Sequence, residues 1–266
     1  MKIFYFTTTG NCLYIAKNLG GELLSIPQML KQETTHFKDD IIGFVTPCYG
    51  FAVPSIVCRF MEKHTFEADY FFAVMSYGNI LAAGLSEFEK LANKSNIKLN
   101  YTNEMLMVDN YLPGFKVEDQ LAKAPSRKID EHIKTIVEDI NNKRENSVGK
   151  LSVGMKIFSA IIHRYNKSLK PTIDNRFSID KQCNQCGTCA KVCPMNNIIV
   201  ETEPKYQHNC TFCLACIHNC PEKAIHITGE KSAARFRNEH IKLKEIITAN
   251  KTVTSPAQAG QVVCHS

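Results

Sequence analysis

Two short cysteine-rich runs constrain this chain more than any other feature of its sequence. Residues 183–194 read CNQCGTCAKVCP and residues 210–221 read CTFCLACIHNCP. In both runs, three cysteines are separated by two residues each, and a fourth cysteine follows after three more residues and precedes proline. Eight of the twelve cysteines of the chain lie in these runs, which repeat at an offset of 27 residues, from Cys183 to Cys210. The identical spacing indicates that both runs bind the same kind of group.

Iron–sulfur clusters require soft thiolate ligands, and each iron of a [4Fe-4S] cube takes one thiolate. The spacing is that of bacterial ferredoxins, in which the fourth cysteine of each run binds the other cluster. We therefore predict two [4Fe-4S] clusters with crossed ligation. The first cluster is assigned Cys183, Cys186, Cys189 and Cys220, and the second is assigned Cys210, Cys213, Cys216 and Cys193.

Structural zinc is the alternative metal that such cysteines could bind. Zinc needs four ligands and usually takes them as two separated C-x-x-C pairs, which three evenly spaced cysteines followed by Cys-Pro fit poorly. A disulfide framework belongs to small secreted domains, whereas clustered cysteines in a cytosolic chain more often bind metal. The other four cysteines (Cys12, Cys48, Cys58 and Cys264) share no metal-ligand spacing.

Composition places the chain among ordinary soluble proteins. Its 266 residues suffice for one large and one small domain, and 44% of them are hydrophobic. The start, MKIFYFTTTG, is not a secretory signal, and no apolar run reaches the roughly 18 residues that a membrane span needs. The net charge of +6 includes no block of like charges, so nucleic-acid binding is not indicated. We expect a cytoplasmic protein without a transmembrane segment.

The first half of the chain alternates between strand and helix patterns. This alternation predicts an α/β fold with a doubly wound, flavodoxin-like parallel sheet of order 2-1-3-4-5. The expected strands are residues 2–6, 22–26, 40–47, 69–78 and 98–108, and the expected helices are 13–20, 54–64, 84–95 and one long helix over 118–142. A small α+β ferredoxin-like domain follows. The predicted domains are 1–146 (sheet domain), 147–174 (linker), 175–228 (cluster domain) and 229–266 (C-terminal tail with a short helix).

The linker contains a second amphipathic pattern. Its apolar residues recur at helical spacing, and basic residues lie among them. The apolar set is Val153, Ile157, Phe158, Ile161, Ile162 and Tyr165, and the basic set is Lys156, His163, Arg164 and Lys167. We expect a linker helix packed against the domains, because most amphipathic helices serve tertiary packing. A helix on a membrane surface is the alternative.

The stretch TTTGNC, residues 7–12, lies where a doubly wound sheet binds phosphate, after the first strand and at the start of the first helix. Gly10 lets the backbone approach a ligand, and Thr7, Thr8, Thr9 and Asn11 offer polar side chains. The stretch is neither a Walker A loop nor G-x-G-x-x-G, so a nicotinamide dinucleotide is not indicated.

The same stretch resembles the phosphate loop of flavodoxins, T-x-T-G-N-[TS], with Cys12 in place of the final hydroxyl residue. In that family two further loops hold the flavin ring, and they correspond here to TPCYGF (46–51) and SYGN (76–79). The resemblance implies FMN, with Tyr49 and Tyr77 beside the ring. The implied contacts beyond residues 7–12 are Pro47, Cys48, Tyr49, Gly50, Phe51, Ser76, Tyr77, Gly78 and Asn79. Cys12 and Cys48 belong to these loops, and a redox-active pair is the alternative to two small buried residues.

The whole arrangement resembles the flavodoxin–ferredoxin fusion electron carriers of anaerobic bacteria and archaea. The resemblance covers nearly all of the chain and includes residues 103–114 and 236–246. It implies FMN, two [4Fe-4S] clusters and low-potential electron transfer between one-electron and two-electron partners.

Three functions fit this prediction. The preferred one is an electron-transfer flavoprotein that works with a ferredoxin, a reductase or a dehydrogenase, and a homodimer is compatible with it. Basic residues of the tail would dock an acidic partner: Lys231, Arg235, Arg237, Lys242 and Lys244. The second function is an FMN-dependent reductase of a quinone or nitro compound, and the third is a redox or oxygen sensor. We find no arrangement of side chains that predicts acid–base or nucleophilic catalysis.

Overall fold

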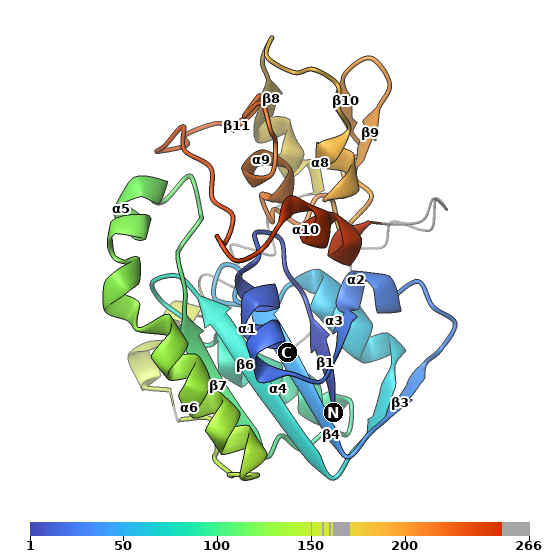
Figure 1. Cartoon of the computed structure of the whole chain (residues 1–266), viewed down its shortest axis with the longest axis vertical. Coiled ribbons are helices and arrows are strands. Elements are labelled where there is room, and N and C mark those ends of the chain that lie inside the picture. The colour runs from blue at the N-terminus through green and yellow to red at the C-terminus, as the bar shows by residue number, and fades with distance from the viewer. Residues whose placement is uncertain (150, 156, 160, 162–170, 252–266) are drawn as a thin grey trace.

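A computed structural model describes residues 1–149, 151–155, 157–159, 161 and 171–251. Its largest unit is a five-stranded sheet in which every neighbouring pair is parallel. The strands stand in the order β2 (Glu22–Ser25), β1 (Lys2–Tyr5), β4 (Ile41–Pro47), β6 (Tyr70–Tyr77) and β7 (Tyr101–Leu106) (Figure 1). The prediction of an α/β fold with a five-stranded parallel sheet is confirmed.

The strand order does not match the predicted 2-1-3-4-5 exactly. Two short strands, β3 (His36–Lys38) and β5 (Thr65–Glu67), intervene in the chain and pair with each other in a separate parallel sheet. Each has only three residues and alternates exposed polar with apolar side chains, so neither produces a buried strand pattern. The observed order is therefore β2-β1-β4-β6-β7.

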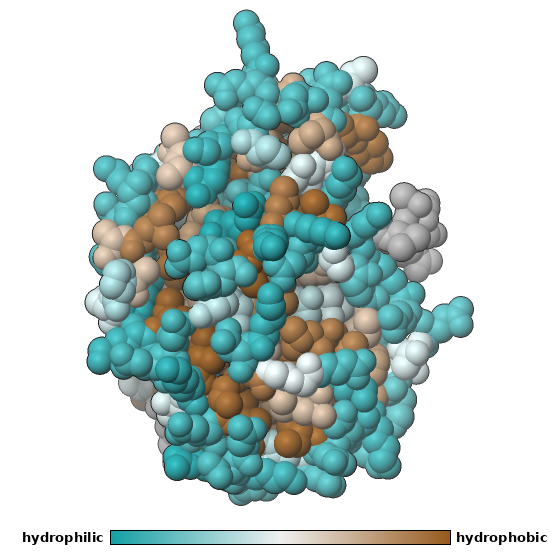
Figure 2. Space-filling model, in the orientation of Figure 1, coloured by the Kyte–Doolittle hydropathy of each residue, from teal (hydrophilic) through white to brown (hydrophobic). Residues whose placement is uncertain are grey.

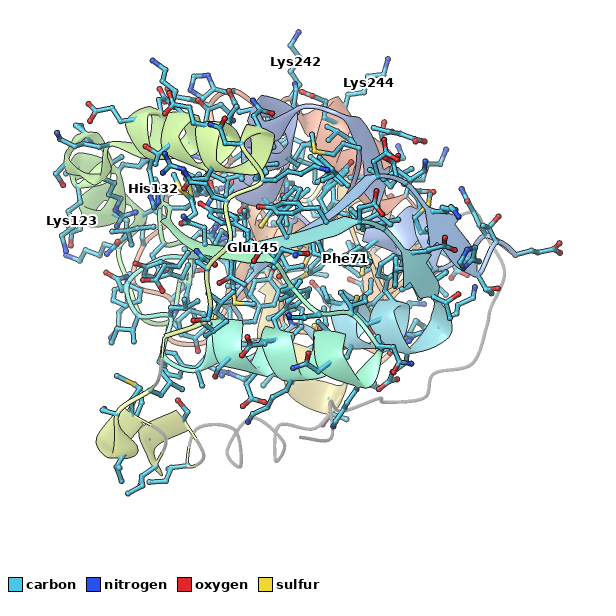
Figure 3. All side chains as sticks on the ribbon, turned by 90° about the horizontal axis from the view of Figure 1, so that it is seen from below. Phe71, Lys123, His132, Glu145, Lys242 and Lys244 are labelled. Atoms are coloured by element: carbon cyan, nitrogen blue, oxygen red, sulfur yellow. The ribbon has the colours of Figure 1, made fainter. Side chains whose placement is uncertain are left out.

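Helices cover both faces of the sheet (Figure 3). Alternate residues along β1 point to opposite faces, so that Ile3 and Tyr5 join one core cluster while Phe4 and Phe6 join the other. The first cluster packs against α1 (Asn11–Leu19) and α6 (Ile129–Asn141). The second packs against α2 (Ile26–Met29), α3 (Ser55–Lys63) and α4 (Gly84–Lys94).

The long helix predicted over 118–142 is wrong. The chain instead forms α5 (Val117–Ala122), the 3₁₀ helix η1 (Ala124–Arg127) and α6. Pro125 has no N–H to continue α5, and Lys128 takes a left-handed φ of 47° that no α-helix can contain.

The cysteine-rich part forms a compact unit beside the carboxyl edge of the sheet (Figure 1). Two antiparallel pairs frame it: β8 (Phe177–Ile179) with β11 (Ile225–Ile227), and β9 (Ile198–Val200) with β10 (Pro204–Tyr206). Two four-residue helices, α8 (Thr188–Lys191) and α9 (Ala215–His218), lie at equivalent positions of the internal repeat. A short 3₁₀ helix, η2 (Pro171–Arg176), precedes β8.

The C-terminal segment packs back onto the sheet unit. Its helix α10 (Leu243–Asn250) contributes Ile246 and Ala249 to the core cluster that contains α1 and α6. Figure 2 shows that the face on which α10 lies is mainly hydrophilic, with apolar residues in a broken band between the elements. The domain boundaries given above stay a prediction, but the described part of the tail shares a core with the sheet unit. Within the described residues, no helix combines the length and the apolar character that a membrane crossing requires.

Candidate metal centres and the loops beside them

The two cysteine loops turn through the same left-handed positions. Gln185 and Gly187 have positive φ values of 61° and 70° in the first run, and Phe212 and Leu214 have values of 55° and 58° in the second. These pairs are equivalent in the repeat. Left-handed residues let the chain curl tightly between successive cysteines, so the side chains of each run point toward a common centre.

The first group of thiols contains Cys220 in addition to the first three cysteines of run one. Burial raises the pKa of Cys189 to about 11, and the nearby thiolates of Cys220, Cys183 and Cys186 raise it further. Cys186 differs because it is exposed to solvent. Its hydrogen bond with the Thr188 hydroxyl, with 3.3 Å between Sγ and Oγ1, lowers the pKa of the Cys186 thiol.

The second group is more deeply buried and contains Cys193 with the first three cysteines of run two. Burial raises the pKa of Cys210 to about 12, and the charges of Cys193 and Asp174 raise it further. Burial also raises the pKa of Cys213 and Cys216, and neighbouring thiolates of the same group contribute. The fourth cysteine of each run therefore lies with the first three of the other.

A cavity separates the four sulfurs of the second group. It encloses about 310 Å³ of space that protein atoms do not fill, part of it open to solvent. Its other lining residues include Phe177, Ile198, Tyr206 and Leu214. Among the described residues, no three His, Cys, Asp or Glu side chains are placed to share a single metal ion.

These residues fit a [4Fe-4S] cluster. A cube needs four thiolates around a volume, in apolar surroundings that limit solvent access, and the second group supplies both. Buried thiols with raised pKa values lose their protons readily only when a nearby metal stabilises the negative charge, which is what a cluster does.

A buried carboxyl group beside the second group could not be recognised in the sequence. Asp174 is 1% exposed, and its carboxyl oxygens accept hydrogen bonds from Asn197 Nδ2 at 2.8 Å and His208 Nδ1 at 2.7 Å. Its charge contributes to the raised pKa values of Cys193 and Cys210. Asp174 precedes the first cysteine run, outside any motif, and no local signal marks it.

The predicted phosphate loop is covered by the rest of the chain. Thr7, Thr8, Thr9, Asn11 and Cys12 are each at most 8% exposed. Their backbone carbonyls and side chains accept hydrogen bonds from asparagines of distant segments. Thr7 O accepts from Asn250 at 2.9 Å, Thr8 O from Asn219 at 2.9 Å, Thr9 O from the Asn238 N–H at 2.8 Å, and Asn11 Oδ1 from Asn238 at 3.3 Å.

The side chains that would grip a phosphate already have partners. Thr7 Oγ1 accepts the Gly10 N–H at 3.1 Å, and Thr9 Oγ1 accepts a hydrogen bond from Asn110 at 2.8 Å. Thr8 Oγ1 shares a 2.8 Å hydrogen bond with the hydroxyl of Tyr49. The Cα of Gly10 faces the C-terminal segment, since a Cβ there would lie 2.9 Å from Asn238 Cβ and 3.0 Å from Ile241 Cβ.

The two ring loops are at the carboxyl ends of β4 and β6, as predicted, but their tyrosines have different surroundings. Tyr49 reaches into the phosphate loop, and burial followed by the nearby Cys213 thiolate raises its pKa. Tyr77 lies near Glu104 and Arg127. Asn79 donates to Asp109 Oδ2 at 2.6 Å, and that carboxyl group packs directly over Gly78.

FMN does not fit these loops as they are folded. Its phosphate would have to enter a loop that is closed to solvent and displace the Tyr49 hydroxyl from Thr8. FMN at residues 7–12, 47–51 and 76–79 therefore stays a sequence-based prediction without support from the structure, in which the first loop binds other parts of the chain. A local motif cannot reveal this, because the covering residues come from segments more than 200 positions away.

The thiols of Cys12 and Cys48 have different partners. The Cys12 Sγ lies 3.1 Å from Ser76 Oγ, and the Cys48 Sγ lies 3.6 Å from the Leu81 carbonyl oxygen. Burial raises the pKa of each thiol to about 12. Cys12 is buried and Cys48 half-buried, and raised thiol pKa values do not favour a reactive pair. Cys264 lies outside the described residues.

The basic residues of the tail fall into two classes. The side chain of Arg235 is only 4% exposed and forms an ion pair with Glu230 at 3.2 Å, so Arg235 cannot dock a partner. Lys242 and Lys244 point away from the body of the protein (Figure 3). Lys231 and Arg237 are also exposed.

The comparisons agree with the cysteine geometry. Residues 182–225 match the family of 4Fe-4S dicluster domains. Over 70 residues the chain is 33% identical to NADH-quinone oxidoreductase subunit I 2 of Geobacter metallireducens. The matched region makes up 22% of this chain and 53% of that protein. The chain thus spans about half the length of the curated relative it matches.

One solved structure, the Trp repressor binding protein from Bacillus subtilis, is similar over 40% of this chain and 85% of its own. The identity is 15% and the TM-score 0.28, too low to support any argument. The match over residues 182–225 therefore supports a 4Fe-4S dicluster ferredoxin-type domain near the C-terminus of the chain.

Proposed function

We propose that this protein is a low-potential carrier of single electrons in the cytosol. Each of its two sets of four cysteines would hold one [4Fe-4S] cluster. Cys183, Cys186, Cys189 and Cys220 would hold the first, and Cys210, Cys213, Cys216 and Cys193 the second. A bound cluster of this kind takes up and releases one electron at a time. The observation that supports the proposal best is the exchange of the fourth cysteine between the two runs.

The surroundings of the second group suit a protected centre. Asp174 places a carboxyl group beside Cys193 and Cys210, where negative charge makes the gain of an electron less favourable. The hydrogen bonds from Asn197 and His208 hold that carboxyl group in place. These residues would keep the potential of the centre low.

The first group is where a redox partner would approach. Cys186 is exposed, while Cys183 and Cys220 are half-buried, so this group lies nearer to solvent than the second. The exposed side chain of Lys191 reaches the Cys186 carbonyl oxygen at 3.5 Å. A positive charge here favours a partner whose docking surface is acidic.

FMN is left out of the proposal because of the closed loop at residues 7–12. A reductase of quinones or nitro compounds would need the flavin, so that second function has no observation in its favour. Flavin release from anaerobically purified protein tests this part on its own. We expect no flavin in the supernatant after heat denaturation, and about one FMN per chain would overturn our interpretation of the loop.

Electron-transfer measurements test the proposal itself. After anaerobic reduction with dithionite, we expect an EPR signal from reduced clusters and rapid oxidation by a soluble one-electron acceptor. Protein that shows no EPR signal, or that reacts only with hydride acceptors, would contradict the proposed function.

A further inference from the structure

The hydroxyl of Tyr206 lies beside a cysteine of the second group. Its oxygen is 3.9 Å from the Cys216 sulfur, and the two atoms form a hydrogen bond. A thiolate has no hydrogen to give, so the tyrosine hydroxyl is the donor whenever Cys216 binds metal. The sulfur of one candidate ligand therefore receives a side-chain hydrogen bond.

The ring of Tyr206 is held in place on two sides. Tyr206 pairs with Ile198 where β10 lies beside β9 (Figure 1). The edge of its ring meets the ring of Phe177, with 5.4 Å between the centroids and 68° between the planes. Tyr206, Ile198 and Phe177 all line the cavity between the four sulfurs of the second group. Strand pairing and aromatic packing thus direct the hydroxyl toward the place where a cluster would lie.

The first group receives its hydroxyl from a different position. Thr188 Oγ1 is 3.3 Å from the Cys186 sulfur. At the repeat offset of 27 residues, Ile179 corresponds to Tyr206 and Ala215 corresponds to Thr188, and neither of these side chains has a hydroxyl. The two donors therefore occupy non-equivalent positions, so the repeat does not treat its two halves alike.

A hydrogen bond to a ligand sulfur makes a cluster easier to reduce. The added electron increases the negative charge on the sulfurs, so the bond is stronger in the reduced state than in the oxidised state. Burial enlarges this difference, because water weakens such a bond less where it is excluded. Cys216 is 7% exposed, whereas Cys186 is exposed to solvent. We therefore expect the larger effect at Cys216.

We propose that the Tyr206 hydroxyl raises the reduction potential of the second [4Fe-4S] cluster, and that Thr188 raises that of the first cluster by a smaller amount. This inference rests on the proposed function, since a potential exists only where a cluster is bound. Tyr206 opposes Asp174, whose negative charge lies beside Cys193 and Cys210 and lowers the potential of the same centre. Two side chains of opposite effect would then set one potential.

An EPR-monitored redox titration of the full-length protein, purified without oxygen, tests the proposal. In Tyr206→Phe, one cluster should be about tenfold less reduced at a fixed potential, which corresponds to a midpoint about 59 mV more negative for one electron. The other cluster should be unchanged. Thr188→Val should lower the potential of that other cluster by a smaller amount. The control is Tyr101→Phe on β7, which removes a hydroxyl bonded to Asp139 at 2.8 Å and should change neither potential.

A second background shows on which cluster Tyr206 acts. Cys193→Ala should remove the second cluster and keep the first. Adding Tyr206→Phe to this variant should leave the potential of the remaining cluster unchanged. A fall in that potential would show that Tyr206 acts on the first cluster, and it would overturn the proposal.

Iron and acid-labile sulfide, measured on each sample, separate the possible failures. An unchanged potential of Tyr206→Phe that still holds about eight irons would overturn this inference and leave the proposed function intact. Loss of iron from Tyr206→Phe would assign the hydroxyl to cluster binding and would also overturn the inference. Wild-type protein without iron and sulfide would overturn both the inference and the proposed function.

Discussion

Replacing Cys193 by Ala should damage the second cluster although Cys193 belongs to the first run. Its side chain is 8% exposed and lies with Cys210, Cys213 and Cys216. Its sulfur accepts the Asn197 N–H at 3.3 Å. The substitution removes one of four thiolates and leaves that buried N–H without a partner, at a cost of about 1–3 kcal/mol. Iron should fall from about eight to about four per chain if the cluster is lost.

Double variants decide whether the ligands cross. If they do, Cys193→Ala with Cys210→Ala removes two ligands of the same cluster, so about four irons should remain. Cys193→Ala with Cys183→Ala then damages both clusters and should leave almost none. Iron and acid-labile sulfide, measured beside the EPR signal of the reduced protein, provide the assay. The reverse result, with four irons in the second double variant and none in the first, would refute crossed ligation.

Three further predictions test the surroundings of the site. Gly10→Ala should destabilise the fold by about 1–3 kcal/mol more than Gly20→Ala. Both glycines have positive φ, but only at Gly10 would a Cβ meet the C-terminal segment, at 2.9 Å from Asn238 Cβ. Equal unfolding midpoints of the two variants would contradict the close packing. Asp174→Asn should raise the reduction potential of one cluster in an EPR-monitored titration, and an unchanged potential would remove the carboxyl group from our account. The hydrogen bond to Glu230 raises the pKa of His226. The protonated His226 therefore stabilises the fold fully below about pH 6.5, and this stabilisation is lost as the pH rises through the raised pKa of the folded protein. Thermal unfolding of wild type and His226→Gln between pH 6 and pH 9 should therefore converge, and parallel curves would be evidence against this coupling.

The sequence predicted those parts of the structure that depend on local patterns. Strands β1, β4 and β6 are mainly buried apolar runs, and all five sheet strands were expected within a few residues of their observed positions. The cysteine spacing was equally informative, because chain geometry allows few ways to arrange four thiolates around a cube. The break at Pro125 could also have been predicted, since proline inside a helical pattern ends the helix.

Long-range contacts account for most of what the sequence did not reveal. The phosphate loop has a flavodoxin-like motif, yet Asn219, Asn238 and Asn250 cover it. No local sequence pattern indicates that an asparagine donates a hydrogen bond to a residue far away in the chain. Asp174 is similar, because its role comes from packing beside Cys193 and not from its neighbours in the chain.

Metal analysis of protein purified without oxygen tests the central claim most directly. If each of the two sets of four cysteines holds one cube, the protein should contain about eight irons and about eight acid-labile sulfides per chain, with no stoichiometric zinc. Zinc in place of iron, or iron that never exceeds about four per chain, would contradict the presence of two [4Fe-4S] centres.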